Sequence, residues 1–274
     1  MNLYGNLTTL TGEAYLGQGI TFGTDINVQM ILLLEAASRS IDKLCNRFFY
    51  VDSTTRTFDG SNSPLFLQND LLAVTTLKLD EDADGTFEET LASTDYILYP
   101  LNEYPKTYIK ISPNSDYGGF GGSVLEAVEI AGNFGFGDGE RASPLDSLSV
   151  TVTVGTTTGT TITVSADDVI KPGQTILAGT EQIFCSAVTT GTFTGERGMN
   201  GTTAATHTGA STSVYVYPQT ITEATYIQAS RWFKRKDSAF QNIVGTSELG
   251  QLQSQAGLDP DIALIVNSYR RDII

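Results

Sequence analysis

The stretch from Thr220 to Asp237 has the pattern of a helix with two apolar faces, and this feature limits the possible folds more than any other. No glycine or proline interrupts it. At about 100° per residue, its apolar side chains fall into two stripes. The stripes consist of Ile221, Ala224 and Trp232 on one side, and of Tyr226, Ala229 and Phe233 on the other. A surface helix of a monomer needs only one stripe, so the second must be buried against something else.

The second stripe has two possible partners. It can face a neighbouring subunit, which we favour, or it can be buried within its own domain, and the stretch alone fits both. In the first case we expect the subunit interface to contain Tyr226, Arg231, Trp232, Phe233 and Arg235. Thr220 and Glu223 have the spacing of a capping box at the helix start. Three cations at 234–236 complement the helix dipole at its end.

Two further helices are expected. Residues 25–49 place apolar side chains at three- and four-residue steps, which predicts one long helix with a single apolar stripe. Its members are Ile26, Met30, Leu33, Leu34, Ala37, Ile41, Leu44 and Phe48. Near the C-terminus, Asp259 is placed to cap a last helix that has Pro260 in its first turn. Residues 1–24 are weakly patterned, and we interpret them as an arm with one short strand or turn. We interpret residues 238–258 as a long polar loop.

Between the helices the sequence has the pattern of strands. Residues 51–130 contain short alternating runs, including a hairpin in which residues 73–79 and 86–91 flank an acidic turn. Residues 148–218 are rich in Thr, Gly and Val, carry almost no charge and lack a helix signal. This block predicts a separate β module inserted through a surface loop, since loops tolerate insertions whose ends stay close together.

Together these patterns predict an α+β fold. The 25–49 and 220–237 helices are expected to form a small helical bundle core, packed with a β-strand portion. Residues 148–218 are expected to form an inserted all-β domain. The first domain then consists of residues 1–147 and 219–274.

The charge distribution limits the partners. The net charge is −15, and residues 1–147 hold 8 Lys and Arg against 21 Asp and Glu. Nonspecific binding of nucleic acid needs clustered cations, so an acidic body argues against it, although DNA can still pass alongside. The longest apolar cluster, Met30 to Leu34, is too short to cross a membrane. The N-terminus also lacks the pattern of a secretory signal.

No group of residues indicates catalysis. His207 is the one histidine and stands in a Thr/Ala/Gly stretch without a nucleophile motif, so we expect it in an exposed loop. Cys45 and Cys185 are isolated and suggest neither a disulfide nor a metal site. The glycine-rich turns lack the Lys-Ser/Thr that follows a phosphate-binding loop. We therefore predict no enzymatic activity and no cofactor.

The acidic turn is a weak candidate for a calcium site. Asp80, Asp82 and Asp84 precede Gly85 and match the start of a calcium-binding loop. The glutamate expected six residues after the glycine falls at Leu91 instead, and helices do not flank the turn. We predict a metal-free turn. A carbohydrate- or calcium-binding β module with a helical appendage remains the alternative function.

Several segments resemble the head–tail connector proteins of tailed bacteriophages, also called adaptor or head completion proteins. The segments that carry this resemblance are Ile41–Phe49, Arg56–Gly60, Leu98–Asn102, Arg231–Ser238, Leu258–Ile262 and Tyr269–Arg271. The resemblance covers roughly residues 25–147 and 219–274. It rests on the order and spacing of the segments together, while residues 148–218 depart from the compact family pattern.

The resemblance implies a structural virion protein of the phage neck, assembled in the host cytoplasm. About twelve copies are expected to form a homo-oligomeric ring under the portal protein. The ring extends the DNA channel without binding DNA specifically and meets the next head-completion or tail protein. The family's C-terminal segment docks on the portal. On this chain that implies contacts from Asp261, Ile262, Ile265, Val266, Tyr269, Arg270, Arg271, Ile273 and Ile274.

Overall fold

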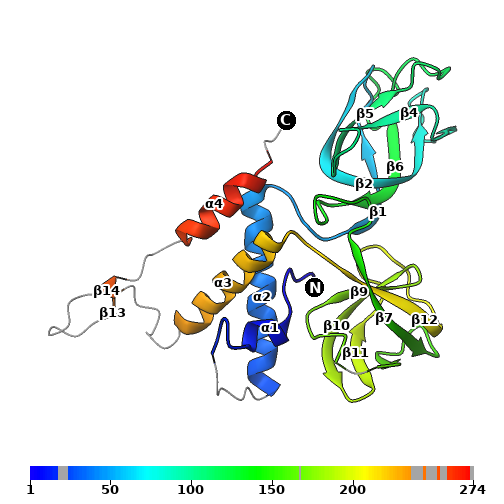
Figure 1. The fold of residues 1–274 in the computed structure, drawn as a ribbon. Coiled ribbons are helices and arrows are strands. Elements are labelled where there is room, and N and C mark those ends of the chain that lie inside the picture. Colours follow the sequence, from blue (N-terminus) through cyan, green and yellow to red (C-terminus); the bar gives the residue numbers. More distant parts are fainter. Residues whose placement is uncertain (18–23, 167, 236–242, 245–251, 254–257, 272–274) are drawn as a thin grey trace.

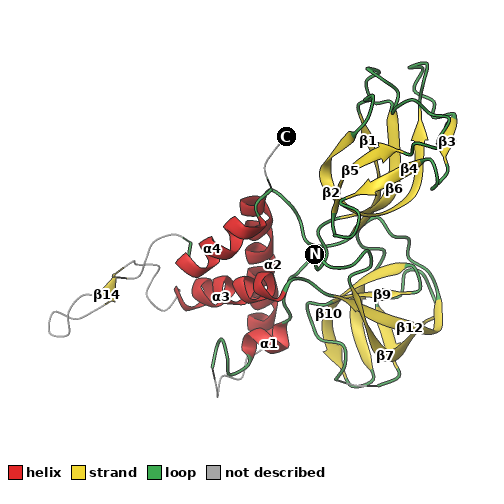
Figure 2. Cartoon of the chain, turned by 45° about the horizontal axis from the view of Figure 1, so that its top comes forward, coloured by secondary structure: helices red, strands yellow, loops and turns green. Residues whose placement is uncertain are grey.

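The chain combines a layer of helices with two β units, as a computed structural model shows (Figure 1). The structure describes residues 1–17, 24–166, 168–235, 243–244, 252–253 and 258–271. The helices lie on one side, and an antiparallel sheet and a closed barrel lie one above the other on the opposite side (Figure 2). The predicted α+β class is therefore confirmed. No helix among the described residues has the length and apolarity that a membrane crossing requires.

Within the described residues, four helices form the helical layer. They are α1 (Leu7–Thr11), α2 (Thr24–Cys45), α3 (Gln219–Arg235) and α4 (Pro260–Tyr269). The Asp259 side chain accepts a hydrogen bond from the Asp261 N–H at 3.0 Å and caps α4, as predicted. α2, α3 and α4 pack against one another. The buried apolar residues nevertheless form several separate clusters, so a helical bundle is not the single core of the molecule.

The second apolar stripe of α3 is buried by the chain's own N-terminal residues. Tyr226, Ala229 and Phe233 share a cluster with Leu7 and Leu10 of α1 and with residues of α2. The first stripe packs through Ile221 and Ala224 in a cluster with α4. The alternative that we favoured, burial of the second stripe against a neighbouring subunit, is wrong for these side chains. The arm predicted at residues 1–24 is likewise folded onto the helices where it is described.

The predicted capping box does not form. α3 begins at Gln219, ahead of Thr220. The Thr220 hydroxyl lies 3.0 Å from the Tyr269 hydroxyl. The Glu223 carboxylate accepts a hydrogen bond of 2.5 Å from the Tyr15 hydroxyl. Both side chains therefore connect α3 to other segments instead of capping its first turn.

α2 follows the predicted stripe for most of its length. Met30, Leu34 and Ile41 are fully buried. Leu44 departs from the prediction with an exposed fraction of 40%. The helix ends at Cys45 and not at residue 49, because Asn46 adopts a positive φ of 53° that breaks the helical backbone.

The sheet contains six antiparallel strands. They are β1 (Asp52–Phe58), β2 (Leu65–Leu79), β3 (Glu89–Leu91), β4 (Tyr96–Tyr99), β5 (Lys106–Ile111) and β6 (Val128–Phe134), in the order β1-β6-β2-β5-β4 with β3 also on β2. The predicted hairpin is confirmed, since Leu77 pairs with Leu91. β2 begins at Leu65, well before the predicted run of residues 73–79, and register shifts along it mark its irregular pairing with β5 and β6.

The barrel lies between residues 145 and 215. Its strands are β7 (Leu145–Val154), β8 (Thr161–Val164), β9 (Thr175–Ala178), β10 (Glu181–Thr189), β11 (Thr192–Glu196) and β12 (His207–Tyr215). Val152, Ile162, Ile176 and Ile183 fill its interior. Tyr215 pairs with Leu145, so the two ends of the barrel lie together. That this block is an inserted, independently folding domain remains a prediction. Two short strands, β13 (Ile243–Val244) and β14 (Leu252–Gln253), pair with each other outside the barrel, within the stretch that we predicted as a polar loop.

Specific contacts join the barrel to the rest of the chain. The Gln182 side chain donates a hydrogen bond of 3.0 Å to the Val51 carbonyl. The Leu7 N–H donates to the Pro172 carbonyl at 2.8 Å. Phe184 of β10 is buried in the cluster of the N-terminal segment and the helices. The barrel therefore supports both α1 and the start of β1.

Candidate functional site

The C-terminal segment is fixed at a buried carboxylate. Asp70 of β2 is 2% exposed. Nη1 of Arg271 donates a hydrogen bond of 2.7 Å to Oδ1 of Asp70, and Nη2 donates to the Leu67 carbonyl. Arg47 lies beyond the end of α2, and its Nε is 3.6 Å from Oδ2 of Asp70. The Arg271 N–H also donates to the Cys45 carbonyl at 2.8 Å. Two arginines from distant segments thus share one carboxylate.

Burial dominates the electrostatics of this cluster. It raises the pKa of Asp70, and the guanidinium groups of Arg47 and Arg271 offset only part of that effect. Burial likewise lowers the pKa of Arg47. Removing one partner would leave an incompletely compensated charge in a poorly hydrated site. The role of the cluster that this geometry supports is to hold the end of α4 against β2 and α2.

The residues predicted to dock on a portal differ in their burial. Ile262 and Val266 are buried in the chain's own core with Ile41 and Ile221, so they are not available at the surface of this conformation. Asp261 and Arg270 are exposed. Ile265, Tyr269 and Arg271 are half-buried, and Arg271 is held by Asp70. Ile273 and Ile274 lie outside the described residues.

The residues predicted for a subunit interface are mostly engaged within the chain. The Tyr226 hydroxyl accepts a hydrogen bond of 2.8 Å from the Asn6 N–H, and its ring packs on Tyr15. Arg231 forms an ion pair of 2.8 Å with Asp259. Phe233 is buried. Trp232 and Arg235 remain half-buried at the surface.

The acidic turn is organised by its own backbone. Asp80 accepts hydrogen bonds of 2.8 Å from the N–H groups of Ala83 and Gly85. Asp84 accepts one from Thr86 at 2.8 Å. Carboxylate oxygens of Asp80, Asp82 and Glu88 lie within 4.8 Å of one another, so the sequence-predicted Asp84 is replaced by Glu88 in the cluster. Exposed acidic turns commonly adopt such arrangements without a metal ion.

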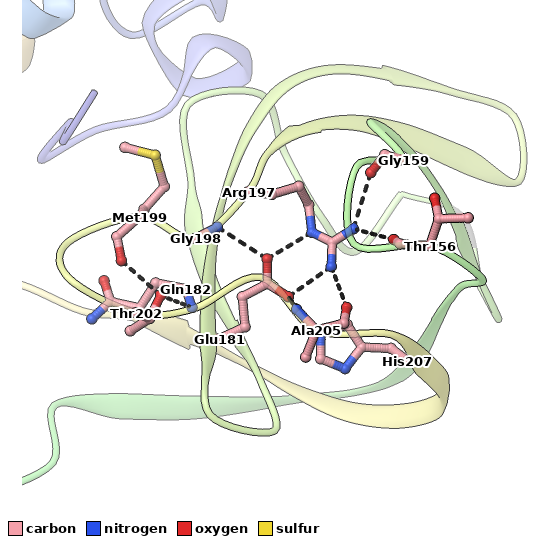
Figure 3. A network of polar contacts seen from close by, with 10 residues as sticks. All are labelled: Thr156, Gly159, Glu181, Gln182, Arg197, Gly198, Met199, Thr202, Ala205 and His207. Atoms are coloured by element: carbon pink, nitrogen blue, oxygen red, sulfur yellow. Dashed lines mark hydrogen bonds and ion pairs between the residues drawn. The ribbon is translucent and has the colours of Figure 1, made fainter.

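His207 is buried, contrary to the prediction of an exposed loop. It lies in β12 with an exposed fraction of 6%, and its Nε2 is 2.8 Å from Oε2 of Glu181 (Figure 3). Arg197 makes two hydrogen bonds of 2.7 Å to the same carboxylate. The N–H groups of Gly198 and Ala205 also donate to Glu181. Sequence reasoning missed this because no local motif connects His207, Glu181 and Arg197.

The hydrogen bonds of Glu181 and Arg197 join several loops of the barrel to one another. Burial raises the pKa of Glu181, but the hydrogen bonds from Arg197, Ala205, His207 and Gly198 outweigh it and lower the pKa to about 2. Arg197 further donates to the carbonyls of Thr156 and Gly159 at 3.3 and 3.0 Å. The other contacts of Glu181 and Arg197 are backbone amides and carbonyls, and within the described residues the His207 ring makes no hydrogen bond to a serine or a cysteine. The arrangement therefore supports a structural role.

A cleft of about 580 Å³ separates the sheet from the barrel. The residues that line it include Ser53, Thr55, Thr75, Thr180 and Tyr215. None of the described residues that line it is charged. Such a surface offers neutral hydrogen-bonding groups to a molecule that enters the cleft.

α2 carries an exposed apolar surface that the sequence interpretation did not separate from the buried stripe. Val28 and Leu32 are 55% and 50% exposed. The signal was available, because both residues are apolar and fall off the single stripe predicted for residues 25–49. On α4, Leu264 is 72% exposed, although the predicted portal contacts did not include it.

Comparison with known proteins does not identify a family for this chain. No family model matches the chain. No curated protein matches it either. Among solved structures it is similar to a chain described as "Neck of empty GTA particle computed with C6 symmetry", at 13% sequence identity and a TM-score of 0.37, over 98% of this chain and 90% of that one. A TM-score at this level does not establish a shared fold, so the proposal below rests on the chain's own residues.

Proposed function

We propose that this protein is a structural subunit of a phage neck, which forms a ring under the portal and connects the head to the tail. About twelve copies surround a channel through which DNA passes. The acidic charge, −15 for the chain, suits a wall that DNA slides past without being held. The other face of the ring meets the next head-completion or tail protein.

The observation that carries this proposal is the convergence of the segments that resemble connector proteins. Arg271 binds the carbonyl of Cys45, and Arg231 pairs with Asp259, so four of these segments meet at the helical layer. These segments are far apart in the chain and yet build one local structure. Their convergence supports the view that they serve one architectural role. The exposed apolar residues of α2 add a surface suited to assembly.

Electron microscopy of the purified protein tests the ring, first alone and then with portal protein. We expect closed rings in at least one of the two samples. Monomers in both samples, at concentrations far above those of a neck during assembly, would contradict the proposal. The copy number follows from the symmetry of the rings.

Portal docking by the C-terminal segment is tested separately. We propose that the end of the chain, from Arg270 onward, makes this contact, since Arg270 is exposed whereas Ile262 and Val266 are buried in the core. Removal of residues 272–274 leaves Arg271 and its contacts with Asp70 in place. We expect this truncation to weaken portal binding without lowering the melting temperature. Unchanged portal binding would assign the contact to another segment.

A further inference from the structure

The exposed apolar residues of α2 lie along one ridge of the helix. Val28, Leu32, Ala36, Ser40 and Leu44 follow one another at four-residue steps. Residues spaced in this way line up as a ridge on a helix surface, and such ridges pack into the grooves of another helix. Val28, Leu32, Ala36 and Leu44 are all exposed. A helix that covers this ridge is the partner that its geometry fits.

The ridge contains a notch. Leu32 lies on one side of it and Leu44 on the other, while the small side chains of Ala36 and Ser40 lie between them. A notch of this kind accepts one large apolar side chain from a facing helix. The partner therefore needs an isolated apolar residue on an otherwise polar helix face.

α4 presents such a residue. Leu264 is 72% exposed, and on the same side Asp261 precedes it by three residues and Ser268 follows it by four. The remaining large apolar residues with high exposure, apart from those of α2, are Phe66, Leu101 and Leu125, which lie in strands or loops. Within the described residues, Leu264 is thus the exposed helical leucine that fits the notch.

Charge supports the same pairing. Lys43 is exposed and lies seven residues after Ala36, which places the two within about 20° of each other around α2. Asp261 is exposed on α4. Neither Lys43 nor Asp261 has an ion pair within the described chain. If Leu264 enters the notch with α4 antiparallel to α2, Asp261 comes to lie beside Lys43.

The two surfaces cannot meet within one copy. α4 already packs on its own α2 through Ile262 and Val266, which point away from Leu264. That contact uses Ile41 and Cys45, on the buried side of α2. The ridge and Leu264 therefore belong to different surfaces of the molecule. A contact between the ridge of one copy and Leu264 of another copy can repeat head to tail from copy to copy.

We propose that α4 of one copy docks on α2 of the next, with Leu264 in the notch between Leu32 and Leu44 and Asp261 beside Lys43. This inference rests on the ring proposed above and names its subunit contact. The contact is heterologous, so successive copies close into a ring when the rotation between them allows it.

Cysteine cross-linking tests the contact. The native Cys45 and Cys185 are buried, so they give a low background. The variants are A36C, L264C and the double variant A36C/L264C, oxidised mildly with and without portal protein. We expect a ladder of dimers, trimers and larger species from the double variant. An equal mixture of the two single variants should give dimers only, and each single variant alone should remain uncross-linked.

Each other outcome has a defined meaning. Dimers of A36C alone indicate a symmetric α2–α2 contact and overturn the inference. The absence of cross-links in a sample whose micrographs show rings also overturns it, but leaves the proposed function in place. The absence of both cross-links and rings, with portal present, overturns the inference and the ring together.

Charge reversal provides a second, independent measurement. K43D and D261K should each weaken association, and the double variant should restore it, because the pair is then reversed. L264D should weaken association by about tenfold or more and leave the melting temperature unchanged, since Leu264 is exposed in the single copy. Unchanged association in L264D, or no restoration in the double charge variant, counts against the contact.

Discussion

Arg271 donates a hydrogen bond of 2.7 Å to Asp70, which is 201 positions earlier in the chain. The contact brings the end of the helical layer onto β2, and Arg47 approaches the same carboxylate from the end of α2. One buried carboxylate thus connects three distant segments. The C-terminal residues that resemble connector proteins are therefore part of the fold as well as candidates for a partner surface.

The first prediction concerns this contact. Arg271→Ala should lower the free energy of unfolding by about 1–3 kcal/mol, since it removes a charge-assisted hydrogen bond from a buried carboxylate that Arg47 compensates only in part. Arg270→Ala is the matched control, because Arg270 is the exposed neighbour. It should change stability by about 0.5 kcal/mol or less. Urea unfolding measures both, and equal effects would contradict the assigned role of Arg271.

The second prediction concerns pH. The pKa of Glu181 falls from 4.5 to about 2 in the folded protein, so the folded state binds this proton less tightly than the unfolded state. The stabilisation by Glu181 is therefore complete above pH 4.5 and is lost as the pH falls towards 2. Glu181→Gln should destabilise the protein at pH 7, because Arg197 then lies buried without its carboxylate.

Unfolding curves of the wild type and of Glu181→Gln between pH 7 and pH 2 measure this effect. The difference between the two proteins should shrink across the window from pH 4.5 to pH 2. Glu196→Gln is the control, since Glu196 is an exposed acid of the same barrel. A difference that stays constant over this window would contradict the assignment.

The sequence predicted the local elements well where the pattern itself determines them. Alternation identified most strands, and Asp259 with Pro260 marked the start of α4. The sequence pattern could not show which part of the chain covers an apolar face of a helix. The second stripe of α3 is covered by Leu7 and Leu10, more than 200 positions away, and no periodicity encodes that contact.

The same limit applies to buried polar networks. His207, Glu181 and Arg197 come from separate segments of the barrel, and only its closure brings them together. On α2, Val28 and Leu32 could have been recognised, because they are apolar residues outside the predicted stripe. The sequence interpretation assigned the second face to α3, whereas the exposed second face lies on α2.

The third prediction concerns calcium. Addition of about 1 mM Ca²⁺, a concentration that saturates most protein sites, should leave the melting temperature unchanged. Both carboxylate oxygens of Asp80 already accept backbone N–H groups, and Asp84 does not join Asp82 and Glu88 in the cluster. Calorimetric titration of the wild type and of Asp82→Ala measures binding directly. Tight binding that Asp82→Ala abolishes would favour the alternative function, a calcium-binding β module.

The fourth prediction concerns the barrel. A fragment of residues 144–217 should fold by itself, because the barrel is closed, has its own interior cluster and brings Leu145 and Tyr215 together. Circular dichroism and a cooperative thermal transition are the measurements. Ile162→Asp should abolish the transition, since Ile162 is fully buried in the barrel. A fragment without a cooperative transition would show that residues 148–218 are no independent domain.

The last prediction concerns the burial of α3. A Cβ atom at Gly5 would lie 2.5 Å from Cε1 of Tyr226, so a larger residue at this position pushes the N-terminal segment off the helix. Gly5→Ala should therefore cost about 1–3 kcal/mol, the usual cost of overpacking. Gly118→Ala is the control, because a Cβ there meets no atom within 4 Å. If Tyr226 instead faced a neighbouring subunit, Gly5→Ala would leave the monomer unchanged and alter assembly. Thermal unfolding and the mass of the assembly, measured on the same samples, separate the two cases.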